Sequence, residues 1–292
     1  MVALTQKLNL ITHLQLKELK EEALQLALEN ERMKTELEVT RRIQIMILPQ
    51  KEELEQVAGL AIAGFMEPAE EVGGDYYEVL QHDNNGRILI SIGDVTGHGL
   101  ESGMLMLMTQ AAVRTLLEND EQDTVKFFSS LNSIIYKNAQ ERLEVDKNLT
   151  LSLLEYAPTY TGGTLRISGR HEDIIVVRNG QLERIDTGDL GLQVGFIDDI
   201  AEFVNQIEVN LNAGDVVVLY TDGITEAENK DRKEYGIKRL CEIVKQNWQQ
   251  SAEDIKETVI NDVRQYIGSH KVFDDITLVA ESFQYPNRLE IN

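Results

Sequence analysis

The chain has 292 residues, a formal net charge of −22 and a single cysteine, Cys241. Its length accommodates one domain of about 150 to 250 residues together with an appendage. The negative charge argues against a nucleic-acid or anionic-membrane binder, because such partners attract clustered Lys and Arg. One cysteine excludes an intramolecular disulfide framework and fits a reducing compartment.

The sequence predicts a cytoplasmic protein, since no apolar run is long enough to span a membrane and the start lacks a signal-peptide pattern. Residues 1–50 hold seven basic and seven acidic side chains, so the negative excess belongs to residues 51–292. This difference predicts two parts: an N-terminal helix in residues 1–50 and a separate folded domain in residues 51–292.

Residues 1–48 contain no Gly and no Pro, which predicts one long helix that Pro49 ends. From Leu16 onward a heptad pattern predicts a parallel two-stranded coiled coil, and hence a homodimer. One seam position holds Leu16, Ala23, Asn30, Leu37 and Gln44, and the other holds Leu19, Leu26, Met33, Thr40 and Ile47. The polar seam residues predict a weak coiled coil that can act as a switch. The alternative is a helix that packs only on its own domain.

From Gly59 onward the pattern changes to short β-branched and apolar runs separated by turns. Strands are expected at residues 60–66, 76–80, 88–92, 149–156, 164–168, 174–178, 182–185, 203–209, 215–220 and 276–283. Helices are expected at residues 99–117, 124–144, 236–248 and 252–268, the first with a face of core-packing methionines. Turn signals at residues 83–86 and at Asn179-Gly180 predict hairpins and therefore antiparallel pairing. The fold class is α+β, with two antiparallel sheets packed face to face and helices outside.

Two glycine-bracketed turns each carry a carboxylate, Asp75 in VGGDYY and Asp94 in GDVTGHG. If the strands between them form a hairpin, Asp75 and Asp94 lie near the same end of it. Two close carboxylates repel each other, so they share a proton or bind a cation, and Mg²⁺ or Mn²⁺ favours such oxygen ligands. For each residue alone, the alternative is a solvated surface turn.

Two more acidic turns lie at strand ends farther along the chain. Asp222 follows the apolar run Val216–Tyr220, and Asp274-Asp275 leads into the last predicted strand. Several oxygen ligands converging on one edge of a rigid scaffold are what a two-metal site needs. The four turns together therefore predict a metal centre.

The motifs VGGDYY, GDVTGHGLESG, YTDGITEAEN and DDITL resemble, in this order, the SpoIIE group of metal-dependent type 2C (PPM) protein serine/threonine phosphatases, which includes RsbU-like regulators. The similarity covers about residues 40–283 and includes the helical segment EVTRRIQIMILP. The resemblance implies a four-layer αββα sandwich with two Mn²⁺ or Mg²⁺ ions between the sheets.

The resemblance also implies roles for individual residues. Asp94 would bridge both ions, with the backbone carbonyl of Val95 as a further ligand. Asp75 would serve one ion directly or through water, and Asp222 with Asp274 would hold the other. Asp275 stands where the wider family often has Asn and is a candidate to support the ligands. A metal-activated water would then attack phosphorus in line, without a phosphoenzyme.

The implied substrate is a phosphoserine or phosphothreonine on a partner protein of the anti-sigma-factor antagonist type, with control through the N-terminal helix.

His98 is either a general acid or a residue of turn packing, and His171 is expected to be structural. No arginine corresponds to the phosphate-binding arginine of the eukaryotic branch. The alternatives are a non-catalytic binding module of the same fold and a nucleotide cyclase, because Gly73-Gly74-Asp75 is similar to the GGDEF loop of diguanylate cyclases.

Overall fold

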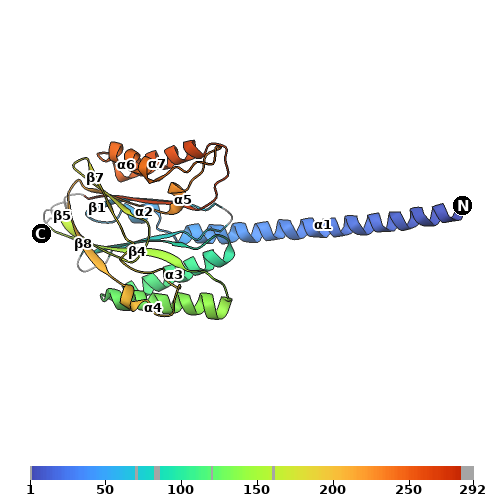
Figure 1. The fold of residues 1–292 in the computed structure, drawn as a ribbon, viewed down its shortest axis with the longest axis horizontal. Coiled ribbons are helices and arrows are strands. Elements are labelled where there is room, and N and C mark those ends of the chain that lie inside the picture. The colour runs from blue at the N-terminus through green and yellow to red at the C-terminus, as the bar shows by residue number, and fades with distance from the viewer. Residues whose placement is uncertain (1, 70–71, 82–85, 120, 160–161, 284–292) are drawn as a thin grey trace.

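A computed structural model describes residues 2–69, 72–81, 86–119, 121–159 and 162–283, with the side chains of 2–12, 14 and 18 excepted. A long helix, α1 (Val2–Ile47), leads into a four-layer sandwich of two sheets between two pairs of helices (Figure 1). The predicted fold class is confirmed. The expected hairpin turn at residues 83–86 lies, except for Gly86, outside the described residues.

The first sheet has five antiparallel strands that come from both ends of the folded domain. Their order is β1 (Leu60–Glu67), β10 (Ile276–Phe283), β9 (Val216–Tyr220), β6 (Ile174–Arg178) and β7 (Gln181–Ile185). The helices α6 (Ile237–Asn247) and α7 (Ala252–Ile267) cover its outer face, where Leu240 and Val259 join a buried cluster with Val218. This layer lies at the top of Figure 1.

The second sheet is also antiparallel and has five strands. Their order is β2 (Tyr76–Gln81), β3 (Ile88–Val95), β4 (Leu149–Pro158), β5 (Gly162–Ser168) and β8 (Gln206–Asn212). The helices α3 (Leu100–Glu118) and α4 (Thr124–Tyr136) cover its outer face, and the π-helical segment η1 (Lys137–Leu143) continues α4. Met106 is fully buried in this layer, which confirms that the methionine face serves packing.

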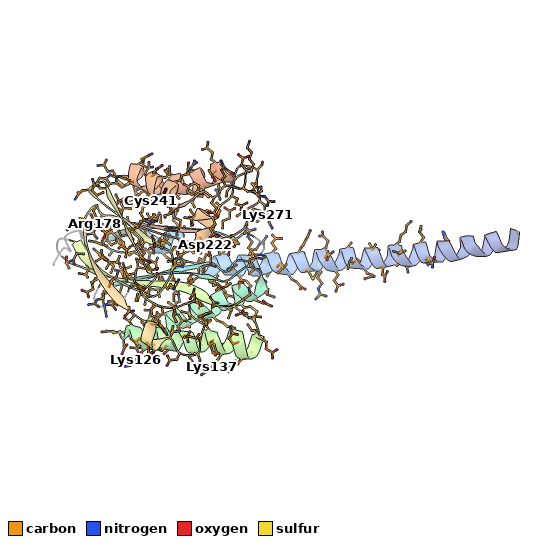
Figure 2. All side chains as sticks on the ribbon, in the orientation of Figure 1. Lys126, Lys137, Arg178, Asp222, Cys241 and Lys271 are labelled. Carbon is orange, nitrogen blue, oxygen red and sulfur yellow. The ribbon has the colours of Figure 1, made fainter. Side chains whose placement is uncertain are left out.

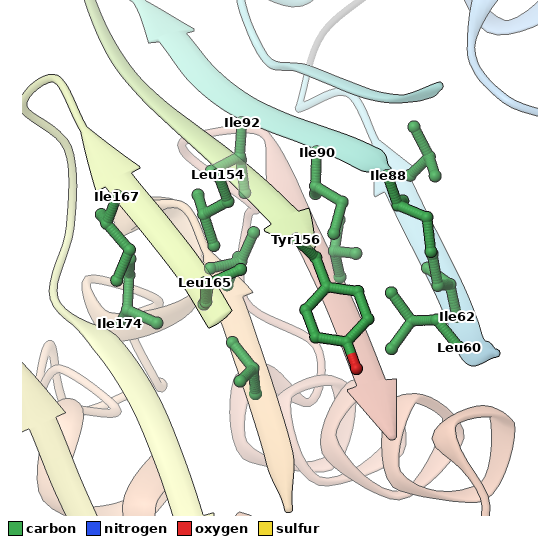
Figure 3. Close-up of a cluster of buried hydrophobic side chains, with 14 of the residues drawn as sticks. Leu60, Ile62, Ile88, Ile90, Ile92, Leu154, Tyr156, Leu165, Ile167 and Ile174 are labelled. Carbon is green, nitrogen blue, oxygen red and sulfur yellow. The ribbon is translucent and has the colours of Figure 1, made fainter. Parts of the chain in front are cut away.

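The main core lies between the two sheets. Successive side chains of a strand point to opposite faces, so Ile88, Ile90 and Ile92 all enter the inter-sheet core from β3 (Figure 3). At one end of this core the ring of Tyr156 meets that of Phe283 edge-on, with centroids 4.8 Å apart. The alternation fixes the register, because a slip by one residue would turn every apolar side chain outward.

Most predicted elements are present, with differences at their ends. The expected strand at 203–209 is displaced to β8, because Ala201–Phe203 forms a 3₁₀ turn. The short helices α2 (Lys51–Leu54) and α5 (Asp222–Thr225) were not predicted. Asn179 (φ 50°) and Gly180 (φ 76°) both have positive φ between β6 and β7, as a two-residue hairpin turn requires.

Helix α1 changes character along its length. In the single chain Leu19 and Leu26 of the predicted seam are 64% and 62% exposed, whereas Gln44 is only 1% exposed. The heptad pattern placed Gln44 in the seam, but the structure buries it against the folded domain. None of the helices in the described part of the chain combines the length and the apolar character that crossing a bilayer requires.

Candidate functional site

Asp75 and Asp94 lie at the same end of the β2–β3 hairpin, as the sequence predicts. Asp75 directly precedes β2, and Tyr76 pairs with Gly93 across the two strands. Asp94 is in β3 and pairs with Thr150 of β4, so it lies in the strand and not in the following turn. Ladder hydrogen bonds therefore fix the backbone of Asp94 more firmly than a turn would.

Asp222 and Asp274 come from the other sheet. Asp222 begins α5, separated from the end of β9 by Thr221, and Asp274 lies two residues before β10. Because β9 and β10 are antiparallel neighbours, the end of one strand lies beside the start of the other. Figure 2 shows Asp222 on the side of the sandwich where α1 enters.

Two threonines join the sheets at this edge. The Thr221 hydroxyl donates a 2.7 Å hydrogen bond to Oδ2 of Asp75, and the Thr277 hydroxyl donates to the same oxygen. Asp75 is 1% exposed, so water has little access to it and these two hydroxyls are the donors to this oxygen among the described residues. Neither threonine was predicted, although both stand in the motifs YTDG and DDITL beside the acids.

Asp275 organises the backbone around Asp75. Its Oδ1 accepts a 2.8 Å hydrogen bond from the Ala69 N–H. Its Oδ2 accepts from the N–H groups of Gly74 at 2.6 Å and of Asp75 at 3.2 Å. A Cβ on Gly73 would lie 2.2 Å from this oxygen, so glycine is required there. These bonds support the expectation that Asp275 holds the ligands in place.

The acids repel one another. Burial, and next the charges of Asp94 and Asp275, raise the pKa of Asp75 well above its usual value. Burial, and next the charges of Asp222 and other acids in the site, raise the pKa of Asp94 to about 8. Burial, and next Asp274, raise the pKa of Asp222 to about 6. The four predicted acids are therefore electrostatic neighbours.

The site fits a divalent cation by its chemistry. None of the main contributions to the pKa shifts of Asp75, Asp94 and Asp222 comes from a basic side chain. Oδ1 of Asp222 is buried and has no hydrogen-bond partner among the described residues. A cation of high charge density would offset the repulsion among the carboxylates and would give Oδ1 of Asp222 a partner. The backbone carbonyl of Val95 also faces this region, since a Cβ on Gly74 would lie 2.5 Å from its oxygen.

The side chains are not closed around an ion as they stand. Within the described ranges, no group of three or more His, Cys, Asp or Glu side chains has the arrangement of a formed metal site. The acids share one volume without a ready-made cage.

The two histidines differ in their surroundings. His98 is an exposed residue of the turn before α3. His171 is held at Nδ1 by the Thr150 hydroxyl at 2.8 Å and at Nε2 by the Tyr220 carbonyl at 3.1 Å. Burial lowers the pKa of His171 to about 4, so the ring is neutral and Nε2–H donates to that carbonyl. These bonds tie the two sheets behind the site and support a structural role.

Lys147 supports the loop after Asp94. Its ammonium donates to the Thr96 carbonyl and to the Ser102 hydroxyl, both at 2.9 Å. The Thr96 N–H donates to the neighbouring Asn148 carbonyl at 2.9 Å. Lys147 could not be predicted as a supporting residue, because it belongs to none of the four motifs.

The model of the Stage II sporulation protein E (SpoIIE) family matches residues 84–284, more than half of the chain. The chain belongs to the SpoIIE family. Protein IcfG of Synechocystis sp. is 24% identical over 269 residues, which are 84% of this chain and 41% of IcfG. The phosphoserine phosphatase RsbU of Bacillus subtilis is 24% identical over 251 residues, which are 85% of this chain and 70% of RsbU. The chain thus spans less than half the length of IcfG.

Among solved structures, the SiaA-PP2C domain of Pseudomonas aeruginosa is similar with a TM-score of 0.72 at 20% identity, over 87% of this chain and 98% of that domain. At this identity the likeness shows the fold, which is the PP2C-type sandwich. The predicted membership of the SpoIIE group is confirmed by the family match, and the predicted sandwich by the shared fold. Membership of the SpoIIE family removes the cyclase alternative.

Proposed function

We propose that this SpoIIE family member is a metal-dependent protein serine/threonine phosphatase that acts on a phosphorylated partner protein. The observation that carries the proposal is the meeting of Asp75 and Asp94 from one sheet with Asp222 and Asp274 from the other. Buried carboxylates that repel one another without a basic partner are stable when they bind cations. Carboxylates and a backbone carbonyl are the ligands that Mg²⁺ and Mn²⁺ prefer.

Two ions, Mn²⁺ or Mg²⁺, are proposed to bind at these acids. Asp94 is the proposed bridging ligand with the Val95 carbonyl, Asp75 serves one ion, and Asp222 with Asp274 serves the other. When bound, such ions neutralise phosphoryl oxygens and lower the pKa of an attacking water.

The protein's own residues set the geometry of that chemistry. Thr221 and Thr277 donate to Oδ2 of Asp75, so Oδ1 is the oxygen that we propose binds a cation. Asp275 fixes the N–H groups of Gly74 and Asp75 and so orients the carboxylate that follows them. Ligands held by protein hydrogen bonds need little rearrangement when a cation binds.

The substrate is proposed to be phosphoserine or phosphothreonine on a protein of the anti-sigma-factor antagonist type. Two findings support this choice: membership of the SpoIIE family and similarity to RsbU, which is named a phosphoserine phosphatase. The phosphatase domain is proposed to comprise residues 51–292.

Residues 1–50 are proposed to form a dimerisation and signalling helix. In the single chain Leu16, Leu19, Leu26 and Met33 are each at least half exposed along the predicted seam. A second copy of α1 would bury these side chains as a coiled coil. Near its end the helix contacts the domain, so a change in its register or angle at residues 41–48 would reach the site.

Phosphate release from a phosphoserine peptide with Mn²⁺ tests the proposal. The full chain is expected to release phosphate only with a divalent cation, and Asp94→Ala should lose at least about a hundredfold of that rate because the bridging ligand is gone. Asp231→Ala, at an exposed aspartate, is the control and should retain the parent rate. Absence of release from phosphoserine and phosphothreonine peptides and phosphoproteins would instead favour a non-catalytic binding module.

A further inference from the structure

An exposed phenylalanine stands directly beside a proposed metal ligand. Phe273 precedes Asp274 in the chain and is 53% exposed. Its ring meets the ring of His270 edge-on, with centroids 5.4 Å apart, and the Lys271 ammonium lies 5.8 Å from its centroid. Val272 is half-buried and packs on the cluster beneath α6 and α7. The ring is therefore held in place while much of its surface faces solvent.

A second exposed phenylalanine is joined to the same edge through the other sheet. Phe196 is 57% exposed and lies two residues after Val194. Leu149, the first residue of β4, pairs with Val95 on one side and with Val194 on the other, through two hydrogen bonds of 2.9 and 2.8 Å. Because neighbouring strands lie about 4.8 Å apart, Val194 is about 10 Å from Val95.

The loop that carries Phe196 is fixed by a buried side chain of α4. Asn132 is 1% exposed, and its side-chain oxygen accepts a 2.7 Å hydrogen bond from the Gly195 N–H. Its amide nitrogen donates hydrogen bonds of 2.9 Å to the carbonyls of Ile197 and Asp198. These bonds hold the backbone on both sides of Phe196. A group presented on a fixed backbone binds a partner at a lower entropic cost than a mobile one.

The two phenylalanines flank the proposed metal centre from opposite sheets. Phe273 lies before β10 of the first sheet, and Phe196 lies in a loop joined to β4 of the second. A standard protein interface buries about 800 Å² on each partner and is enriched in aromatic side chains at its centre. Figure 2 shows Lys271, like Asp222, on the side of the sandwich where α1 enters. The cation beside Phe273 therefore complements the negative charge of a phosphorylated partner.

On the basis of the proposed function, we propose that Phe273 and Phe196 are specificity-determining residues that dock the phosphorylated segment of the substrate protein. The segment lies extended across the edge of the sandwich, with its phosphorylated residue at the acids and an apolar side chain on each ring. An extended chain advances about 3.3 Å per residue. The side chain at Phe196 is therefore about three to five residues from the phosphorylated one. The side chain at Phe273 is closer to it and on the opposite side.

The test uses phosphoserine peptides that differ at one position. A background of Ser and Gly carries a single Leu at each position from five before to five after the phosphoserine, and the peptide without Leu is the reference. The ratio of kcat/KM for a Leu peptide to that for the reference, measured with Mn²⁺, reports docking separately from the overall rate. The full chain should give a ratio of about ten at one position on each side, which corresponds to about 1.4 kcal/mol of contact.

Each phenylalanine should account for one of the two preferences. Phe273→Ala should abolish the preference near the phosphoserine, and Phe196→Ala the more distant one on the other side. Phe203→Ala, the same change at a phenylalanine that is 45% exposed and precedes β8, should keep both. Matching phosphonate peptides cannot be hydrolysed, so their affinities, measured by fluorescence anisotropy, should show the same ratios without turnover.

Three results would overturn the proposal. Equal kcat/KM for all peptides, or preferences that survive both variants, would remove the docking surface and leave the proposed phosphatase activity intact. The competing occupant is a second copy of the chain. A parent dimer that Phe273→Ala and Phe196→Ala convert to a monomer in light scattering would assign the rings to self-association. Absence of phosphate release from every peptide would overturn the proposed function, and the docking surface with it.

Discussion

The Asp275 carboxylate accepts a 2.6 Å hydrogen bond from the Gly74 N–H, 201 positions earlier in the chain. This bond joins the start of β10 to the segment before β2 and places the two sheets in contact at the acidic site. It also separates two roles for neighbouring aspartates: Asp274 is a proposed ligand, whereas Asp275 is occupied by backbone donors.

Replacing Asp275 should lower Mn²⁺ affinity to the extent that its backbone donors lose their acceptors. In Asp275→Asn the amide oxygen can still accept from Gly74 and Asp75, so only the bond to Ala69 is lost. In Asp275→Ala all three donors lose their partner, and Mn²⁺ affinity should fall about tenfold to a hundredfold. Calorimetric titration of both variants measures the difference. Equal affinities for the alanine variant and the parent would show that these bonds do not organise the site.

Removing one charge should stabilise the metal-free protein. Asp94→Asn removes a half-buried carboxylate charge from its repelling neighbours, and one pKa unit corresponds to about 1.4 kcal/mol. The free energy of unfolding in EDTA should therefore rise by at least about 1 kcal/mol at neutral pH. Mn²⁺ should raise the melting temperature of the parent but not of the variant. A variant that Mn²⁺ stabilises as strongly as it stabilises the parent would argue against Asp94 as a ligand.

The Thr221 hydroxyl should contribute to stability through Asp75. Thr221→Val keeps the shape of the side chain but removes a donor to Asp75 and an acceptor for the Thr277 N–H at 3.1 Å. Leaving buried polar groups without partners costs about 1–3 kcal/mol. Urea unfolding should show a loss of that size for Thr221→Val and little change for Thr115→Val, at an exposed threonine. If the two variants lose equally little, the threonine bridge is not a stabilising feature.

Glu281 should make stability depend on pH. It is fully buried in β10, neither carboxylate oxygen has a partner among the described residues, and burial raises its pKa from 4.5 to about 8. The folded state holds the proton more tightly, so the contribution to stability is complete below pH 4.5 and is lost as pH rises toward 8. At about 1.4 kcal/mol per pKa unit, the loss amounts to about 3–5 kcal/mol.

Urea unfolding of Glu281→Gln at pH 5 and pH 8.5 checks this sign, because the variant has no proton to lose. The variant should gain stability relative to the parent as pH rises. If the parent and the variant lose the same free energy of unfolding between pH 5 and pH 8.5, Glu281 does not ionise within the fold over this range.

The exposed face of α1 should control the oligomeric state. Leu26→Glu places a charge in the predicted seam and should convert a dimer into a monomer, and Leu19→Pro should do the same by breaking the helix. Leu24→Glu, at an equally exposed position outside the seam, is the matched control. Light scattering after size exclusion measures mass, and phosphate release measures the change in turnover. If the parent is a monomer and none of these variants changes the rate of phosphate release, signalling through a dimer is rejected.

The sequence by itself determined features that depend on neighbouring residues. A segment without Gly or Pro forms α1, alternating side chains define β3, and Asn179-Gly180 forms the turn between β6 and β7. The four motifs also located Asp75, Asp94, Asp222 and Asp274 at strand ends. Backbone geometry and side-chain alternation act over a few residues, so a linear pattern records them.

Only the tertiary structure decided which of these residues meet. The bonds from Thr221 and Thr277 to Asp75 join positions 146 and 202 residues apart, and the backbone donors of Asp275 lie 200 to 206 residues before it. In the sequence Gln44 occupies a position of the heptad seam. In the structure its side-chain amide instead forms hydrogen bonds with the Gly73 peptide, because the end of α1 packs on the domain. Such contacts depend on how the two sheets and the helix pack together. A pattern of neighbouring residues cannot predict that packing, because the partners are far apart in the sequence.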